Sequence, residues 1–190
     1  MADPATERYA AAPAPLSLRR VQSFMNTRAV GRLPEPDLLA RPAAANEWLR
    51  SLDWHDAPRM RADDLFALRQ IRGALQAHFE ALQAGEQPMA QQALAVVLEN
   101  LRWRMTLEEG QLALAAEGAG WQQVAGRLLS DILLAQQHDL WPRLKRCRNA
   151  SCSVVFYDNS KNRSRVWHNT SVCGNLINLR AARARRHVAA

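Results

Sequence analysis

The segment Cys147-x4-Cys152-x15-His168-x4-Cys173 decides the fold of the C-terminal part of this chain. It contains all three cysteines of the protein and one of its five histidines. Two pairs of thiolate or imidazole donors form the ligand set of a tetrahedral structural Zn²⁺ site. The spacing therefore predicts one zinc ion bound by Cys147, Cys152, His168 and Cys173. The alternative is three buried cysteines beside an unrelated histidine, which ordinary domains also contain.

The segment around these four residues is too short to fold on a hydrophobic core alone, so a metal would supply the missing stability. Val154 to Phe156 and Val166 to Trp167 are expected to form the two arms of a hairpin, with residues 158–162 as its turn. Residues 176–186 are expected to form a basic helix after Cys173. Loop, hairpin and helix meeting at one metal give a treble-clef-like module.

Charge is distributed unevenly between the two parts of the chain. Residues 143–190 hold eleven Lys and Arg against one acid, Asp158, while residues 1–142 hold 14 basic and 17 acidic residues. Clustered cations favour a nucleic-acid partner. The candidate contacts are Lys145, Arg146, Arg148, Lys161, Arg163, Arg165, Arg180, Arg183 and Arg186. The alternatives are a solvated basic face and a docking strip for an acidic partner, including the chain's own N-terminal part.

The rest of the chain predicts a mainly α (α+β) fold. Residues 1–19 are expected to be a flexible lead-in, 20–142 a helical domain and 143–190 the zinc module. Apolar residues at spacings of three and four predict helices over 42–52, from Asp63 or Asp64 to Gly85, over 89–100 and from Trp121 to about 137. Alternation on both sides of Gly110 predicts a hairpin over 103–114.

The apolar stripes of these helices are expected to form the core. Trp48, Trp54, Trp103 and Trp121 are an alternative lining for a small-molecule pocket. We find no apolar stretch of membrane-spanning length and no signal peptide, which predicts a cytoplasmic protein. No Gly-rich phosphate loop, His-Glu-x-x-His or nucleophile elbow is present, so we do not expect an enzyme.

The segment resembles the bacterial CGNR zinc-finger family. The residues that carry the resemblance are Cys147, Cys152, Phe156-x-Asp158-x-Ser160-x-Asn162-x-Ser164-Arg165, Trp167 and Cys173-Gly174-Asn175. Phe24-x-Asn26-Thr27 and Trp48-Leu49 are similar to the ABATE domain that precedes the finger in that family. Two residues depart from the pattern. His168 stands where the family has a cysteine, and Leu176 stands where it has an arginine.

The resemblance implies a zinc-dependent DNA-binding transcriptional regulator. Its N-terminal domain would sense a small-molecule ligand or mediate association into a homo-oligomer. A protein-interaction adaptor with a purely structural zinc module is the alternative function.

Overall fold

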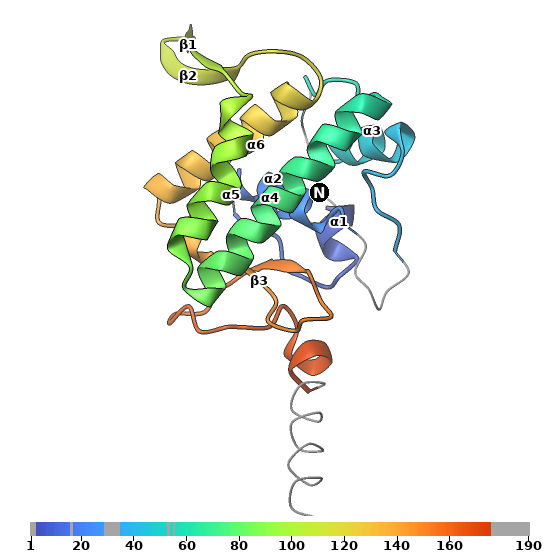
Figure 1. Cartoon of the computed structure of the whole chain (residues 1–190), viewed down its shortest axis with the longest axis vertical. Helices are drawn as coiled ribbons and strands as arrows, with labels where there is room; N and C mark the ends of the chain where they lie inside the picture. Colours follow the sequence, from blue (N-terminus) through green and yellow to red (C-terminus); the bar gives the residue numbers. More distant parts are fainter. Residues whose placement is uncertain (1–2, 16, 29–34, 53, 55, 176–190) are drawn as a thin grey trace, which may run out of the picture.

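In the computed structural model of this chain, the described residues are 3–15, 17–28, 35–52, 54 and 56–175. They form a body of helices with a small hairpin at each end (Figure 1). The α-helices are α1 (Pro4–Glu7), α2 (Leu18–Asn26), α3 (Pro42–Arg50), α4 (Ala62–Ala84), α5 (Gln87–Glu99) and α6 (Trp121–Gln137). The strands are β1 (Trp103–Glu108), β2 (Gln111–Ala116), β3 (Leu144–Arg146) and β4 (Val155–Tyr157). The predicted mainly α fold is confirmed.

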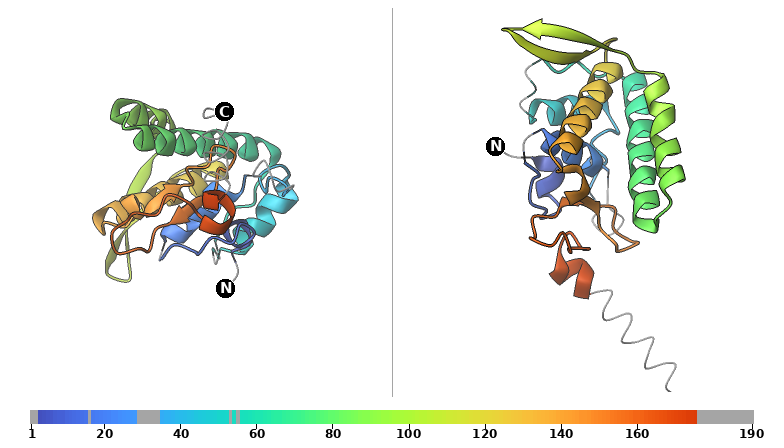
Figure 2. Two further views of the ribbon diagram at one scale, coloured as in Figure 1. Left: turned by 90° about the horizontal axis from the view of Figure 1, so that it is seen from below. Right: turned by 90° about the vertical axis from the view of Figure 1, so that its left-hand side faces the viewer.

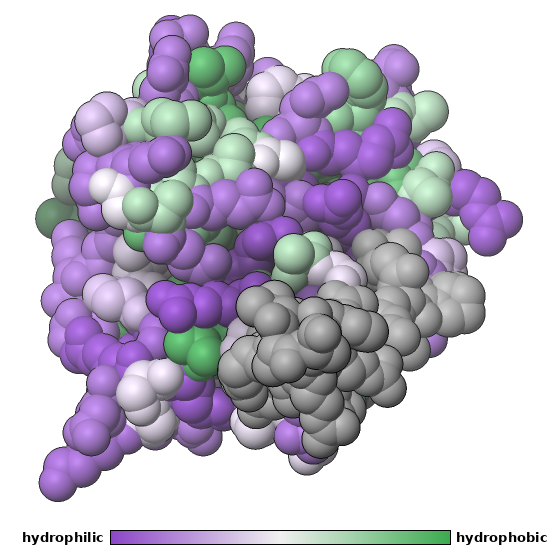
Figure 3. All heavy atoms as spheres, turned by 60° about the horizontal axis from the view of Figure 1, so that its bottom comes forward, coloured by the Kyte–Doolittle hydropathy of each residue, from purple (hydrophilic) through white to green (hydrophobic). Residues whose placement is uncertain are grey.

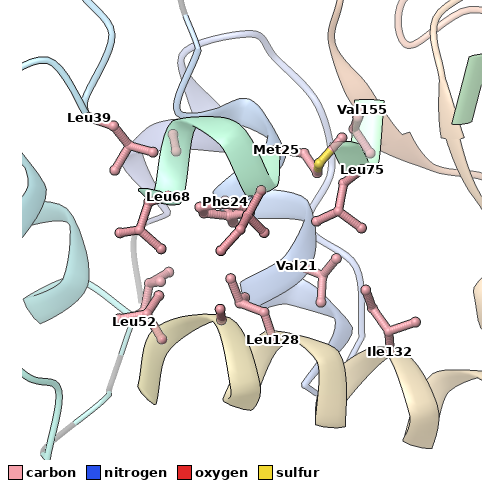
Figure 4. Close-up of a cluster of buried hydrophobic side chains, with 14 of the residues drawn as sticks. Val21, Phe24, Met25, Leu39, Leu52, Leu68, Leu75, Leu128, Ile132 and Val155 are labelled. Carbon is pink, nitrogen blue, oxygen red and sulfur yellow. The ribbon is translucent and has the colours of Figure 1, made fainter. Parts of the chain in front are cut away.

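Helix α2 lies at the centre of the main core. Its Phe24 is fully buried between Leu68 of α4 and Leu128 of α6 (Figure 4). The Phe24 ring also contacts Trp48 of α3, with 6.0 Å between ring centroids. A helix that is buried on nearly all sides must satisfy its polar side chains within the protein.

Two partly buried ion pairs connect segments of the helical body. Arg20 of α2 donates two hydrogen bonds of 2.7 Å to Asp131 of α6. Burial raises the pKa of Asp131, because desolvation disfavours its ionised form more than Arg20 favours it. Arg72, the polar exception in the apolar stripe of α4, binds both carboxylate oxygens of Asp37 at 2.7 and 2.6 Å.

The start of α4 differs from the prediction in one detail. Arg61 occupies the N-cap position, and Asp64 lies in the first turn, where its carboxylate accepts the backbone N–H of Arg61 at 2.8 Å. Asp64 also accepts the backbone N–H of Trp121 at 3.0 Å, so one carboxylate braces the first turns of α4 and α6. A Cβ at Gly120 would lie 2.2 Å from this carboxylate, which explains the glycine before α6.

The predicted hairpin over 103–114 is confirmed as β1–β2, with Met105 opposite Leu114 and Leu107 opposite Leu112. Its apolar side chains are nevertheless exposed. On α5, Ala90 and Val97 are buried, whereas Met89 and Val96, which we expected in the core, face outward. The reason is that α5 packs mainly on α4, so only one narrow stripe of α5 is covered.

Residues 3–15 are not the predicted flexible lead-in. Asp3 caps the short helix α1 by accepting the backbone N–H of Thr6, and its carboxylate also accepts the Ser23 hydroxyl at 2.7 Å. Tyr9 and Ala11 are buried in a second cluster with the cysteines. Although the segment is rich in Ala and Pro, its small residues pack against α2 and the cysteine module. The domain limits at 19 and 142 remain predictions.

The hairpin of the cysteine module also has different arms from those predicted. Strand β3 pairs antiparallel with β4, in the register Leu144 to Tyr157 and Arg146 to Val155. Val166, expected in the second arm, accepts a single backbone hydrogen bond from Arg148. In the turn over 158–162, the Asp158 carboxylate accepts both the N–H and the hydroxyl of Ser160. None of the helices in the described residues is long and apolar enough to cross a membrane.

Candidate metal centre and basic surface

The structure brings Cys147, Cys152, His168 and Cys173 together. Their ligand atoms all lie within 4.8 Å of one another, and the three cysteines are free and buried. The Nδ1 atom of His168 lies 3.5 Å from the Cys152 sulfur and 3.7 Å from the Cys173 sulfur. Bond lengths of about 2.0 to 2.3 Å in a tetrahedron place neighbouring ligand atoms roughly 3.4 to 3.8 Å apart. The donor set and its spacing therefore fit a zinc ion.

Short backbone hydrogen bonds hold the cysteines in place. The N–H of Cys147 donates to Val154 O directly after β3, and the N–H of Cys152 donates to Asn149 O at 2.7 Å. Cys173 lies in the π-helical turn Thr170–Gly174, where its N–H donates to Asn169 O. The loop between β3 and β4 thus carries the first ligand pair, and this turn carries the last cysteine.

Groups around the ligands favour a thiolate at Cys147, whereas burial raises the pKa of Cys173. The Asn149 side chain donates to the Cys173 sulfur at 3.4 Å. A hydrogen bond from Cys152, with further contacts from His168 and the backbone of Asn149, lowers the pKa of Cys147 to about 3. The pKa of Cys152 is raised in turn, because its thiol donates a hydrogen bond to Cys147 and because it is buried. Such a site needs a cation before all its thiols can ionise together.

Gly174, in the Cys173-Gly174-Asn175 motif, has a packing role. A Cβ at this position would lie 3.1 Å from Trp167 and 3.1 Å from Thr170. The glycine therefore lets the turn that carries Cys173 approach the Trp167 ring. Trp167 packs in turn against the cluster that contains the cysteines and Phe156.

Asp158 anchors the segment between β4 and His168. Its buried carboxylate accepts Lys145 Nζ at 2.7 Å, Arg165 N at 2.9 Å and both the N–H and the hydroxyl of Ser160. Burial raises the pKa of Asp158, but these hydrogen bonds outweigh it and hold that pKa well below its usual range. The side chain that pairs with Asp158 is thus Lys145, and Arg165 contributes through its backbone N–H.

We expect Asp158→Asn to destabilise the module by about 2–3 kcal/mol, because an amide cannot accept hydrogen bonds on both sides. Since the folded pKa is lowered, the carboxylate's contribution is complete above the unfolded pKa of about 4 and declines below it. The difference from wild type should therefore stay constant from about pH 8 to pH 5 in thermal unfolding measured at each pH.

The matched control for this substitution is Asp139→Asn, which removes the partner of Arg163 in an exposed ion pair. Exposed pairs contribute little, so its unfolding temperature should remain close to that of wild type. Equal losses in the two variants would contradict the anchoring role of Asp158.

Asn26, quoted in the sequence comparison only as part of a motif, joins the helical body to the module. It is buried, and its Oδ1 accepts Val155 N while its Nδ2 donates to Val155 O, both at 2.9 Å. Its neighbour Thr27 accepts Arg72 Nη1 at 2.8 Å. A contact between positions so distant in sequence leaves no periodic signal, and only the resemblance pointed to these residues.

Four of the predicted nucleic-acid contacts are engaged within the protein. Lys145 pairs with Asp158, Arg146 with Glu80 of α4 at 3.2 Å, and Arg163 with Asp139. Arg165 donates to His168 O at 2.9 Å, and its guanidinium lies 5.5 Å from the Phe156 ring centroid. Arg148 and Lys161 are exposed. Arg180, Arg183 and Arg186, with the basic helix expected over 176–186, lie outside the described residues.

The tryptophans considered for a small-molecule pocket lie in different environments. Trp48 is enclosed in the core, where its indole N–H donates to Ser23 Oγ at 2.9 Å. Trp103 and Trp121 line two different surface grooves. The small-molecule pocket considered for Trp48, Trp54, Trp103 and Trp121 thus gains no support from their placement.

The fold and the site define a zinc-finger protein, in which a helical N-terminal region is packed onto a small C-terminal module with one structural zinc ion. The chain belongs to the ABATE family, which matches residues 18–144 under the description "Putative stress-induced transcription regulator". The CGNR zinc finger matches residues 143–186. Both resemblances noted in the sequence are therefore confirmed. No curated protein matches the chain.

Proposed function

We propose that this protein is a non-enzymatic DNA-binding regulator whose zinc module contacts the phosphate backbone. The observation that carries the proposal is the metal-binding cluster at the centre of segment 143–175, which holds seven Lys and Arg and a single acid. Phosphate contacts account for much of the affinity of DNA-binding proteins. The family description, a stress-induced transcription regulator, supports the same class of function.

The internal contacts of the cations refine the proposal. Lys145 and Arg146 are only partly exposed and mainly stabilise the module. Arg148, after the first zinc ligand, and Lys161, in the loop after β4, carry exposed charge. This end of the molecule presents a mostly hydrophilic face (Figure 3). We therefore assign the phosphate contacts of the described residues first to Arg148 and Lys161.

A closed metal site supports a structural rather than a catalytic role for zinc. Three thiols and one imidazole already form a four-donor set, whereas catalytic zinc sites use three protein ligands and keep one position for water or substrate. The sole acid of the module, Asp158, is buried and saturated with hydrogen bonds. It cannot approach a substrate without losing its role as an anchor.

The test is the salt dependence of binding to a mixed-sequence DNA duplex. Arg148→Ala with Lys161→Ala should reduce the slope of log K against log salt by about 1.8, the loss of two phosphate contacts. Arg41→Ala with Arg59→Ala removes the same charge from exposed positions of the helical body and serves as the control. Its slope should equal that of wild type.

Two outcomes would overturn the proposal. If the zinc-loaded protein binds no duplex even at low salt, the adaptor function takes its place. If both double variants reduce the slope equally, binding follows net charge and the module has no specific role in it.

A further inference from the structure

The helical body and the zinc module border a pocket where they meet, which we call the junction pocket. Its volume is about 440 Å³, within the range of small-molecule sites in proteins. The C-terminal end of α4 and the first residue of α5 form one side of it, and β3 with nearby parts of the module forms the other. Figures 1 and 2 show these ends of α4 and α5 beside the module, and α4 packs against β3. Ligand sites are common where two packed units meet in this way.

The junction pocket has an apolar lining that the fold holds in place. Phe79 of α4, Trp141 and Leu144 line it and are 3, 8 and 3 % exposed, in that order. The rings of Phe79 and Trp141 pack on each other, with 5.1 Å between their centroids. Leu82 and Val166, both partly exposed, extend this lining. A flat hydrocarbon can pack against such a preformed surface at little cost in side-chain entropy.

The charged side chains of the lining are all cations. They are Lys145, Arg146, Arg148 and Arg165. Lys145 pairs with Asp158 and Arg146 pairs with Glu80, so two of the four charges are neutralised within the protein. Among the residues that the structure describes, neither Arg148 nor Arg165 forms an ion pair. Two cations without a counter-ion at one pocket favour an anionic ligand.

Hydrogen bonds position the two unpaired cations. The N–H of Arg148 donates to Val166 O at 3.0 Å, so the segments that carry Arg148 and Arg165 lie side by side. The Arg165 guanidinium donates to His168 O at 2.9 Å and to Asn159 Oδ1 at 3.3 Å. Both acceptors are neutral, so the charge of Arg165 remains available to a ligand. A guanidinium suits a carboxylate, because its planar fork of N–H donors matches the two oxygens.

We propose that the junction pocket binds a small aromatic carboxylate. The acid group of this ligand pairs with Arg148 and Arg165, and its ring packs against Phe79 and Trp141. A phosphate of a DNA backbone would leave the apolar lining uncovered, whereas a neutral hydrocarbon would leave both arginines without a counter-ion. The pocket therefore favours a ligand that combines the two features. The inference does not depend on DNA binding.

The experiment is a titration of the full, zinc-loaded chain with naphthalene-2-carboxylate, followed by NMR. We expect a Kd below about 1 mM, an affinity that a ligand of this size reaches in a site that matches it. The indole N–H resonance of Trp141 should shift on binding, whereas that of Trp48, enclosed in the core, should not. Naphthalene-2-carboxamide, the neutral analogue of the same shape, should bind at least about tenfold more weakly, and so should inorganic phosphate.

Two matched pairs of variants locate the site. Arg148→Gln should weaken binding by about tenfold, whereas Lys161→Gln, which removes the same charge from an exposed position outside the lining, should bind like wild type. Gln87→Trp should fill part of the pocket without a change in charge and weaken binding by a similar factor. Gln91→Trp, one turn further along α5 and outside the lining, is its control. Circular dichroism and zinc content should match wild type in all four variants, which separates loss of the site from loss of the fold.

Absence of naphthalene-2-carboxylate binding up to about 1 mM would overturn the proposal. Equal affinity for the carboxylate and the carboxamide would overturn it too, since the arginines would then not recognise the ligand. Equal affinity for the carboxylate and inorganic phosphate would mean that the apolar lining takes no part, as in a surface for DNA phosphates. Equal losses in Arg148→Gln and Lys161→Gln would show that binding follows net charge, and unchanged binding in Gln87→Trp would place the ligand elsewhere.

Discussion

Removal of the zinc ion is expected to unfold the segment 144–175 and to expose Phe156 and Trp167. The cluster around the site contains few large apolar side chains besides these two, so little hydrophobic energy remains without the metal. Structural zinc contributes about 10–16 kcal/mol in small zinc-finger peptides, more than such a cluster can replace. Chelation should therefore produce a new low-temperature transition and rapid proteolysis within 144–175, and re-addition of zinc should reverse both.

Substitutions at the ligands make this expectation specific. Cys152→Ala should lose zinc and show the same low-temperature transition even in buffer that contains zinc. His168→Cys is the matched variant that keeps four donors, and it should retain one zinc per chain because thiolate and imidazole are both good zinc ligands. Full metal content in Cys152→Ala would contradict the assignment of the site. Loss of zinc in His168→Cys would contradict the position given to the histidine.

Loss of zinc should also destabilise the packing of the N-terminal residues 3–11. Tyr9 and Ala11 are buried in the cluster that contains the three cysteines, although they precede it by more than 130 residues. If the cluster loosens on chelation, the amide protons of residues 3–11 should exchange faster with solvent. Helices α4 and α6, which belong to the main core, should keep their protection.

Periodicity predicted the long elements well, because those elements depend on local sequence. The stripe of α6 from Trp121 to Ala135 and the hairpin over 103–114 have their own repeat and their own glycine-bearing turns. The zinc ligands were equally visible, since coordination chemistry restricts both residue type and spacing. These sequence patterns can be recognised without knowing how the rest of the chain folds.

Contacts between distant segments were not predictable in this way. Alternation around 154–156 and 166–167 predicted one hairpin. β4 pairs with β3 instead, because the loop that carries Cys147 and Cys152 already reverses the chain. Polar side chains such as Asp3 and Asn26 were invisible as core residues, because their burial depends on partners far along the chain. Exposure of the apolar face of the β1–β2 hairpin was not predictable either, because alternation along a strand does not show whether either face is covered.

Asn26 links the helical body to the zinc module through two buried hydrogen bonds. Its amide pairs with both the N–H and the C=O of Val155, so it covers the edge of β4 that β3 leaves free. Gln22, one turn earlier on α2, adds a weaker bond to Val155 O at 3.4 Å. Both backbone groups are buried, and a buried group without a partner costs about 1–3 kcal/mol.

Asn26→Asp should therefore lower the free energy of unfolding by about 3 kcal/mol, because a carboxylate keeps the acceptor but turns a second oxygen toward Val155 O. For a chain of this length we expect a fall of roughly 10 °C in the unfolding temperature. Zinc affinity should fall too, since β4 helps to position the ligands. Asn162→Asp, the same change at an exposed site in the module, should leave both quantities near wild type. If the two variants behave alike, α2 does not hold the module, and the helical body could not transmit a signal to the zinc site through this contact.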